Sequence, residues 1–77
     1  MMLEPRMTAQ EALDAYFLET RAKLLEIAAT LDRIERLPGG AEASGDARLR
    51  FVAEALELLK SGGPGRAERI QRLYSMA

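Results

Sequence analysis

The chain has 77 residues, of which 48% are hydrophobic, and it carries 11 Lys and Arg against 12 Asp and Glu. This composition predicts a single globular domain close to the lower size limit for one hydrophobic core, and it argues against an intrinsically disordered segment. Cys and His are both absent, which excludes disulfides and thiolate metal sites and removes the commonest general base and metal ligand.

The net charge of −1 argues against a dedicated nucleic-acid-binding protein, because such proteins neutralise many phosphates with clustered Lys and Arg. No apolar run is long enough to span a bilayer, so we expect no membrane partner. The first residues lack the apolar stretch of a secretory signal, and a cytoplasmic protein is therefore expected.

The sequence predicts a short arm, residues 1–7, followed by a single helical domain, residues 8–77. Pro5 disfavours a helical conformation at Glu4. The arm is therefore expected to be extended or irregular. Its apolar residues either pack on a neighbouring surface or belong to a frayed terminus, and both interpretations remain open.

The first predicted helix covers residues 8–37, which contain neither Gly nor Pro. Thr8 and Glu11 have the spacing of a capping box, in which each side chain satisfies a backbone N–H at the start of the helix. Pro38 and the glycines after it end the helix. At 1.5 Å per residue this helix is roughly 40 Å long, which makes it the longest element that the chain forms.

Two shorter helices are predicted after the long one, separated by stretches of small residues. The second helix covers residues 46–60 and is capped by Asp46 or by Ser44. The third covers residues 64–75 and takes Pro64 as its first helical residue, where the missing N–H has no cost. A helix as short as the third is unstable alone, so it is expected to dock on the rest of the chain.

The long predicted helix carries apolar residues on two opposite sides. Its main apolar face has heptad spacing and is expected to build the core together with the shorter helices. The members of this face are Leu13, Tyr16, Phe17, Leu24, Ile27, Ala28, Leu31 and Ile34. The opposite side carries four residues at spacings of four, three and four, which we call the Leu/Ala stripe: Leu18, Ala22, Leu25 and Ala29.

A helix on the surface of a small monomer has no evident need for the Leu/Ala stripe. We predict that the stripe contacts a second subunit, because Ala allows two backbones to approach closely, while Arg21 and Asp32 at its edge set the register. Two alternatives remain open. The alanines reflect helix propensity beside scattered surface leucines, or the two shorter helices pack on opposite faces of the long one.

Catalysis and metal binding are not expected from this sequence. The serines have no His or Cys to activate them, as nucleophilic catalysis requires. The glycine-rich segments 38–40 and 62–65 lack the Lys-Ser/Thr pair of a phosphate-binding loop. Glu19 and Glu26 lie on one helix face with Lys23 between them, as in a solvated charged face. We therefore expect no enzyme activity, no cofactor and no bound metal.

Arg66, Arg69 and Arg72 recur at every third position of the last predicted helix. They suggest a basic face for nucleic acid or an acidic partner. The preferred interpretation is a solvated face whose aliphatic stems cover apolar surface, so nucleic acid is not expected as a partner.

The sequence as a whole predicts an all-α fold in which two short helices pack on a long one, and the chains assemble as a homodimeric bundle. The expected function is that of a non-enzymatic interaction protein that associates with itself, with another protein, or with both. The weaker alternatives are the nucleic-acid accessory protein and a carrier of a small apolar ligand near Tyr16, Phe17 and Phe51. The stretch YFLETRAKLLEIAATLDRIER resembles those of small bacterial proteins, a resemblance that implies no activity.

Overall fold

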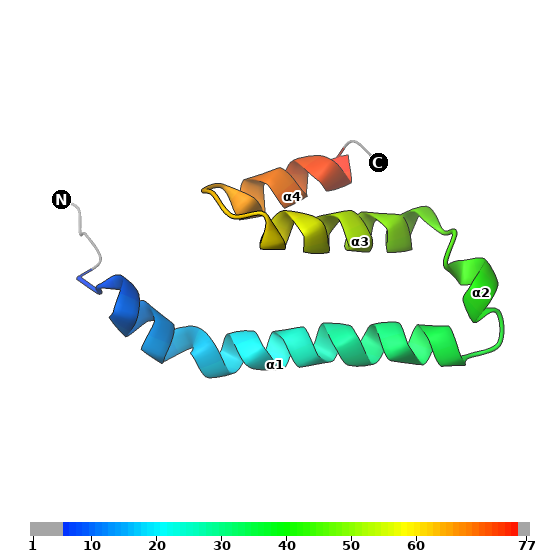
Figure 1. Cartoon of the computed structure of the whole chain (residues 1–77), viewed down its shortest axis with the longest axis horizontal. Coiled ribbons are helices and arrows are strands. Elements are labelled where there is room, and N and C mark those ends of the chain that lie inside the picture. The colour runs from blue at the N-terminus through cyan, green and yellow to red at the C-terminus, as the bar shows by residue number, and fades with distance from the viewer. Residues whose placement is uncertain (1–5, 76–77) are drawn as a thin grey trace. The chain divides into compact units, whose positions relative to one another are not determined.

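The computed structural model describes residues 6–75, and every regular element within them is a helix, in agreement with the predicted all-α class (Figure 1). The helices are α1 (Ala9–Arg36), α2 (Gly40–Ala43), α3 (Ala47–Lys60) and α4 (Arg66–Ser75). Most of the predicted N-terminal arm lies outside the described residues. The chain separates into two compact units, Met1–Arg33 and Ile34–Ala77, which are described separately.

The start of α1 is fixed by the predicted capping box. The backbone N–H of Thr8 donates to Glu11 Oε1 at 3.0 Å, and the backbone N–H of Glu11 donates to Thr8 Oγ1 at 3.1 Å. These two bonds satisfy amides that have no partner inside the helix. From there α1 runs for 28 residues to Arg36, in agreement with the predicted long helix.

The stretch between the first two predicted helices is not only a loop, as the sequence suggested, because it contains the single-turn helix α2. Gly39 has a φ of 86°, a left-handed conformation that ends α1 and that residues with a side chain rarely adopt. The backbone N–H of Ala43 then donates to Gly39 O at 2.9 Å, and Ser44 Oγ donates to Ala41 O at 2.6 Å. These local bonds close the additional turn.

The start of α3 confirms Asp46, rather than Ser44, as the N-cap residue. Its carboxylate accepts a hydrogen bond from the backbone N–H of Arg48 at 2.8 Å.

The start of α4 differs from the prediction, because the helix begins at Arg66 and not at Pro64. Gly65 has a φ of 76°, and its carbonyl accepts the backbone N–H of Arg69 at 2.9 Å. The turn therefore extends past Pro64 before the helix can start.

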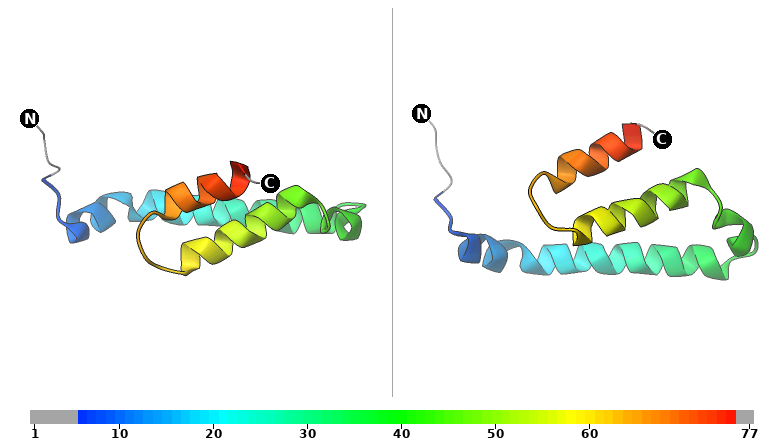
Figure 2. Two further views of the ribbon diagram at one scale, coloured as in Figure 1. Left: turned by 90° about the horizontal axis from the view of Figure 1, so that it is seen from above. Right: turned by 45° about the horizontal axis from the view of Figure 1, so that its top comes forward.

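Helices α3 and α4 lie side by side as an antiparallel hairpin (Figures 1 and 2). Their facing surfaces carry half-buried aliphatic side chains, including Val52, Leu56 and Ile70. Phe51 and Tyr74 join the two helices through an edge-to-face contact, with ring centroids 5.4 Å apart and planes at 69°. Such a contact stabilises a pair of elements beyond the area that it buries. The short last helix thus docks on α3.

None of the side chains in the part of the chain that the structure describes is fully buried. The half-buried hairpin contacts are the most protected apolar positions, together with a few such as Ala12 and Leu31 in α1. The predicted packing of the shorter helices on α1 stays a prediction, as does the single domain over residues 8–77. Among residues 6–75, no helix has the length and apolarity needed to cross a membrane.

Candidate functional site

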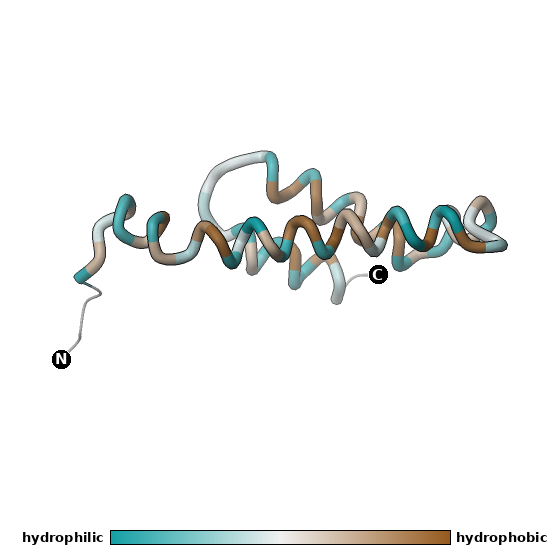
Figure 3. Tube along the Cα trace, turned by 90° about the horizontal axis from the view of Figure 1, so that it is seen from below, coloured by the Kyte–Doolittle hydropathy of each residue, from teal (hydrophilic) through white to brown (hydrophobic). Residues whose placement is uncertain are grey.

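The Leu/Ala stripe lies in the middle of α1, where all four residues are solvent-exposed. Leu18 is 74% exposed and Leu25 is 53% exposed. A single exposed leucine is ordinary on a protein surface, but two leucines one heptad apart with alanines between them form a continuous apolar strip. Figure 3 shows apolar and polar positions alternating turn by turn along this helix.

Charged residues flank the Leu/Ala stripe along both edges. Arg21 and Asp32, which the sequence places at one edge, are both exposed. On the other edge, Lys23 Nζ lies 3.2 Å from Glu19 Oε2, an ion pair one helical turn long that the spacing predicted. Such exposed pairs contribute little to stability. They instead mark the limits of the apolar strip.

The main apolar face of α1 is exposed as well. Phe17 is 52% exposed, and the neighbouring large side chains are similarly accessible: Leu13, Tyr16 and Leu24. Thr20 interrupts this face. Its hydroxyl donates a hydrogen bond to Tyr16 O at 2.9 Å, so its donor has a partner within the helix. Sequence reasoning assigned this face to the core. That assignment stays a prediction, and within the first unit most of this face of α1 is exposed, as the Leu/Ala stripe is.

The predicted basic face is largely engaged within the α3–α4 hairpin. Arg66 Nε donates to Leu59 O at 3.2 Å, and Arg69 Nη2 donates to Gly62 O at 2.9 Å. Arg72 Nη2 lies 3.1 Å from Glu68 Oε2. Arg66 therefore caps a carbonyl in the last turn of α3, where a positive charge also complements the helix dipole, and Arg69 binds a carbonyl of the turn that follows α3. Sequence reasoning missed this capping, because the acceptors lie seven residues earlier, across a turn.

The residues named for a ligand carrier have other surroundings. Phe51 lies against Tyr74 within the hairpin, while Tyr16 and Phe17 are exposed on α1. The carrier hypothesis stays a prediction.

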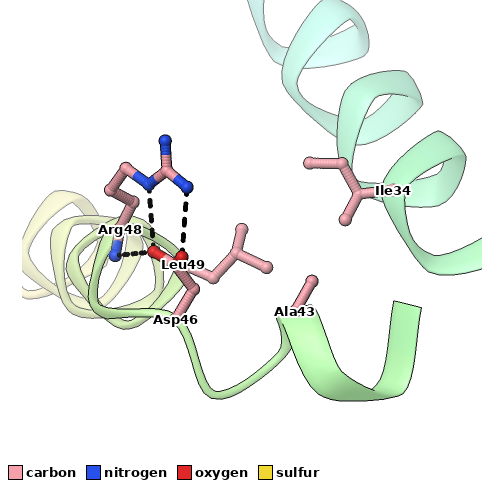
Figure 4. A pocket seen from close by; sticks show the side chains of 5 residues that line it. All are labelled: Ile34, Ala43, Asp46, Arg48 and Leu49. Atoms are coloured by element: carbon pink, nitrogen blue, oxygen red, sulfur yellow. Dashed lines mark hydrogen bonds and ion pairs between the residues drawn. The ribbon is translucent and has the colours of Figure 1, made fainter. Parts of the chain in front are cut away.

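A shallow hollow of about 390 Å³ opens where the end of α1 meets α2 and the start of α3, and sequence reasoning did not locate it (Figure 4). Ile34, Ala43 and Leu49 form its apolar wall. At its rim, Asp46 binds the Arg48 guanidinium through both carboxylate oxygens, at 3.0 and 3.1 Å. These hydrogen bonds lower the pKa of Asp46 to about 2. The carboxylate is thus charged and already occupied, which is unlike a proton-transfer group.

The acidic residues do not gather into a metal-binding cluster anywhere in residues 6–75. Most are spread along helix faces and are solvent-exposed, as Glu19 and Glu26 illustrate. The most extended apolar surface in the first unit is that of α1.

Comparisons of the chain with family models, with curated proteins and with solved structures give no match.

Proposed function

We propose that this protein is a non-enzymatic helical module that associates with a second copy of itself through the Leu/Ala stripe of α1. The observation that supports this proposal is the exposure of Leu18 and Leu25 on a helix that is apolar on two opposite sides. Fully burying one leucine contributes about 1.5–3 kcal/mol. A second chain that covers the stripe recovers part of this free energy at several positions at once.

The first compact unit gives a physical reason for a partner. Within its described residues α1 is the only helix, and a lone helix cannot bury its own side chains. Helical stability in proteins comes mainly from packing an apolar face, not from propensity. Because the two apolar faces of α1 point in opposite directions, a single neighbour cannot cover both. A self-associating helix provides one of the two covers without a further gene product.

The basic-face alternative has weaker support. Arg66 and Arg69 donate hydrogen bonds to backbone carbonyls of their own hairpin, and Arg72 pairs with Glu68. A phosphate would have to compete with these contacts. Salt-dependent binding of a nucleic acid that weakens in the Arg69→Ala variant is the result that would revive this alternative.

The proposal is tested by placing a charge in the stripe. Leu25→Glu buries a carboxylate in the proposed interface, which is strongly unfavourable without a partner charge. We expect this variant to be monomeric by light scattering at tens of micromolar protein, while its circular dichroism still shows helix.

The matched control is Thr30→Glu, which introduces the same charge on the same helix but outside both apolar faces, at an exposed position. This variant is expected to associate as the unmodified chain does. Equal association of the two variants contradicts the proposal. If Leu25→Glu instead abolishes the helical circular dichroism signal of the whole chain, the stripe belongs to the core of the single chain.

A further inference from the structure

We propose that the two copies pair antiparallel along α1, in a register that places each leucine of the Leu/Ala stripe against an alanine of the other copy. This inference rests on the proposed self-association and specifies its geometry. It follows from the order of large, small and charged residues on one side of a helix that is continuous from Ala9 to Arg36.

The Leu/Ala stripe continues in both directions along the same side of α1. Heptad spacing from Ala22 reaches Ala15 and Ala29, and the same spacing from Leu25 reaches Leu18 and Asp32. One step further, Glu11 and Arg36 occupy the two ends of the stripe. The strip thus has Glu11 at its beginning, an apolar centre of leucines and alanines, and Asp32 followed by Arg36 at its end.

In an antiparallel pair, the beginning of the strip on one copy faces the end of the strip on the other copy. When Ala22 faces Leu25 of the second copy, Leu18 faces Ala29 of the second copy, and each large side chain meets a small one. In the same register Glu11 faces Arg36 of the second copy, and Asp32 faces Ala15 of the second copy. The symmetry of the pair produces each of these contacts twice. Opposite charges therefore close both ends of the apolar centre.

Parallel pairing does the opposite. It sets each position against itself, so leucines meet leucines and alanines meet alanines, which leaves the two helices unevenly spaced. It also brings Glu11 against Glu11, Asp32 against Asp32 and Arg36 against Arg36. Like charges placed opposite each other across an interface are destabilising. The charge order along the stripe accordingly selects the antiparallel arrangement.

One edge of the antiparallel register brings Glu19 near Glu26 of the second copy. Lys23 lies between these two positions on the same edge of the helix and already approaches Glu19 to 3.2 Å. The same ammonium group is thus available to offset the negative charge there, at an exposed edge where water and salt screen the repulsion.

The chain has no Cys, so introduced cysteines report contacts directly. The test mixes Leu18→Cys with Ala29→Cys under reducing conditions and then removes the reductant. We expect the disulfide between the two variants to exceed by at least about tenfold the disulfides that either variant forms alone, because only opposed residues reach bonding distance. In the antiparallel register, position 18 lies about 16 Å along the helix axis from its own copy.

A second measurement leaves the stripe unchanged. A spin label at Gln10→Cys, an exposed position at the start of α1, is expected to lie roughly 40 Å from the label on the other copy along the helix axis. In a parallel pair the two labels would lie side by side. A short label distance, or Leu18→Cys dimers that form without the Ala29→Cys partner, overturns the antiparallel register.

The two proposals fail in different ways. If the unmodified chain is a monomer in light scattering at tens of micromolar protein, self-association and the register are removed together. A dimer that keeps its mass but gives no disulfide in the mixture of Leu18→Cys and Ala29→Cys removes the register alone. Disulfides in the mixture together with the long label distance support both.

Discussion

Asp46 combines two interactions at the start of α3. Its carboxylate caps the helix by accepting the backbone N–H of Arg48 at 2.8 Å, and it also binds the Arg48 guanidinium at 3.0 and 3.1 Å. The side-chain hydrogen bond from Arg48 is the main reason that the pKa of Asp46 falls from 3.8 to about 2, and the backbone hydrogen bond adds to it. The same contact raises the pKa of Arg48.

This lowered pKa predicts how stability depends on pH. A carboxyl group whose pKa is lower in the folded chain contributes stability above its unfolded pKa of 3.8, and it loses this contribution as the pH falls toward about 2. Asp46→Asn keeps a capping oxygen but has no charge to lose. We expect the urea midpoint of the unmodified chain to exceed that of Asp46→Asn at pH 5, with the difference shrinking between pH 4 and pH 2. A difference that stays constant over this range contradicts the assignment.

At the scale of elements, the corner between α1 and α2 depends on a close backbone approach. A Cβ built on Gly40 would lie 2.5 Å from Glu35 O and 3.0 Å from Ile34 O. These are backbone atoms of the last turn of α1, so they cannot rotate away as a side chain does. The short α2 therefore packs against the end of α1 only because residue 40 has no side chain.

Gly40→Ala is expected to destabilise the chain by about 1–3 kcal/mol, as overpacking commonly does. The matched control is Gly45→Ala, at the other end of the same corner, where the nearest neighbour of an added Cβ is Glu42 O at 3.8 Å. The control is expected to be neutral or slightly stabilising, because it reduces the freedom of the unfolded chain. Urea unfolding of both variants provides the measurement. Equal midpoints would show that the corner rearranges freely.

The helices predicted from the sequence are those whose ends are fixed by nearby residues. Thr8 and Glu11 identify the start of α1, and Asp46 the start of α3, because a cap acts within three residues. Helix α2 escaped prediction because a single turn has no periodicity to detect. The start of α4 was predicted at Pro64 but lies at Arg66, because Gly65 has a left-handed φ. This conformation depends on the whole turn and is not specified by Pro64 alone.

In the candidate site, too, local sequence spacing predicts some features and not others. Helical periodicity places Leu18 and Leu25 on one strip, and both side chains are exposed in the structure. Periodicity also assigned the opposite face, which includes Phe17, to the core, and this assignment stays a prediction. The partner of either face lies beyond what a local pattern specifies. Hydrogen bonds such as Arg69 to Gly62 depend on how the turn folds, which spacing alone does not encode.

At the scale of the whole molecule, a chain that is 48% hydrophobic leaves every described residue at least partly exposed. Small domains compensate for a thin core with disulfides, metals or association. The absence of Cys and His removes the first of these remedies and the usual ligands of the second. The proposed association of α1 with a second copy would supply the third remedy.

The mass of the unmodified chain in solution is the most direct measure of self-association. Sedimentation equilibrium at tens of micromolar protein is expected to give about 17 kDa, twice the chain mass of 8.5 kDa, as a closed two-fold dimer requires. Dilution should lower this mass toward that of one chain. A species of 8.5 kDa at every concentration that nevertheless unfolds cooperatively would contradict self-association through α1.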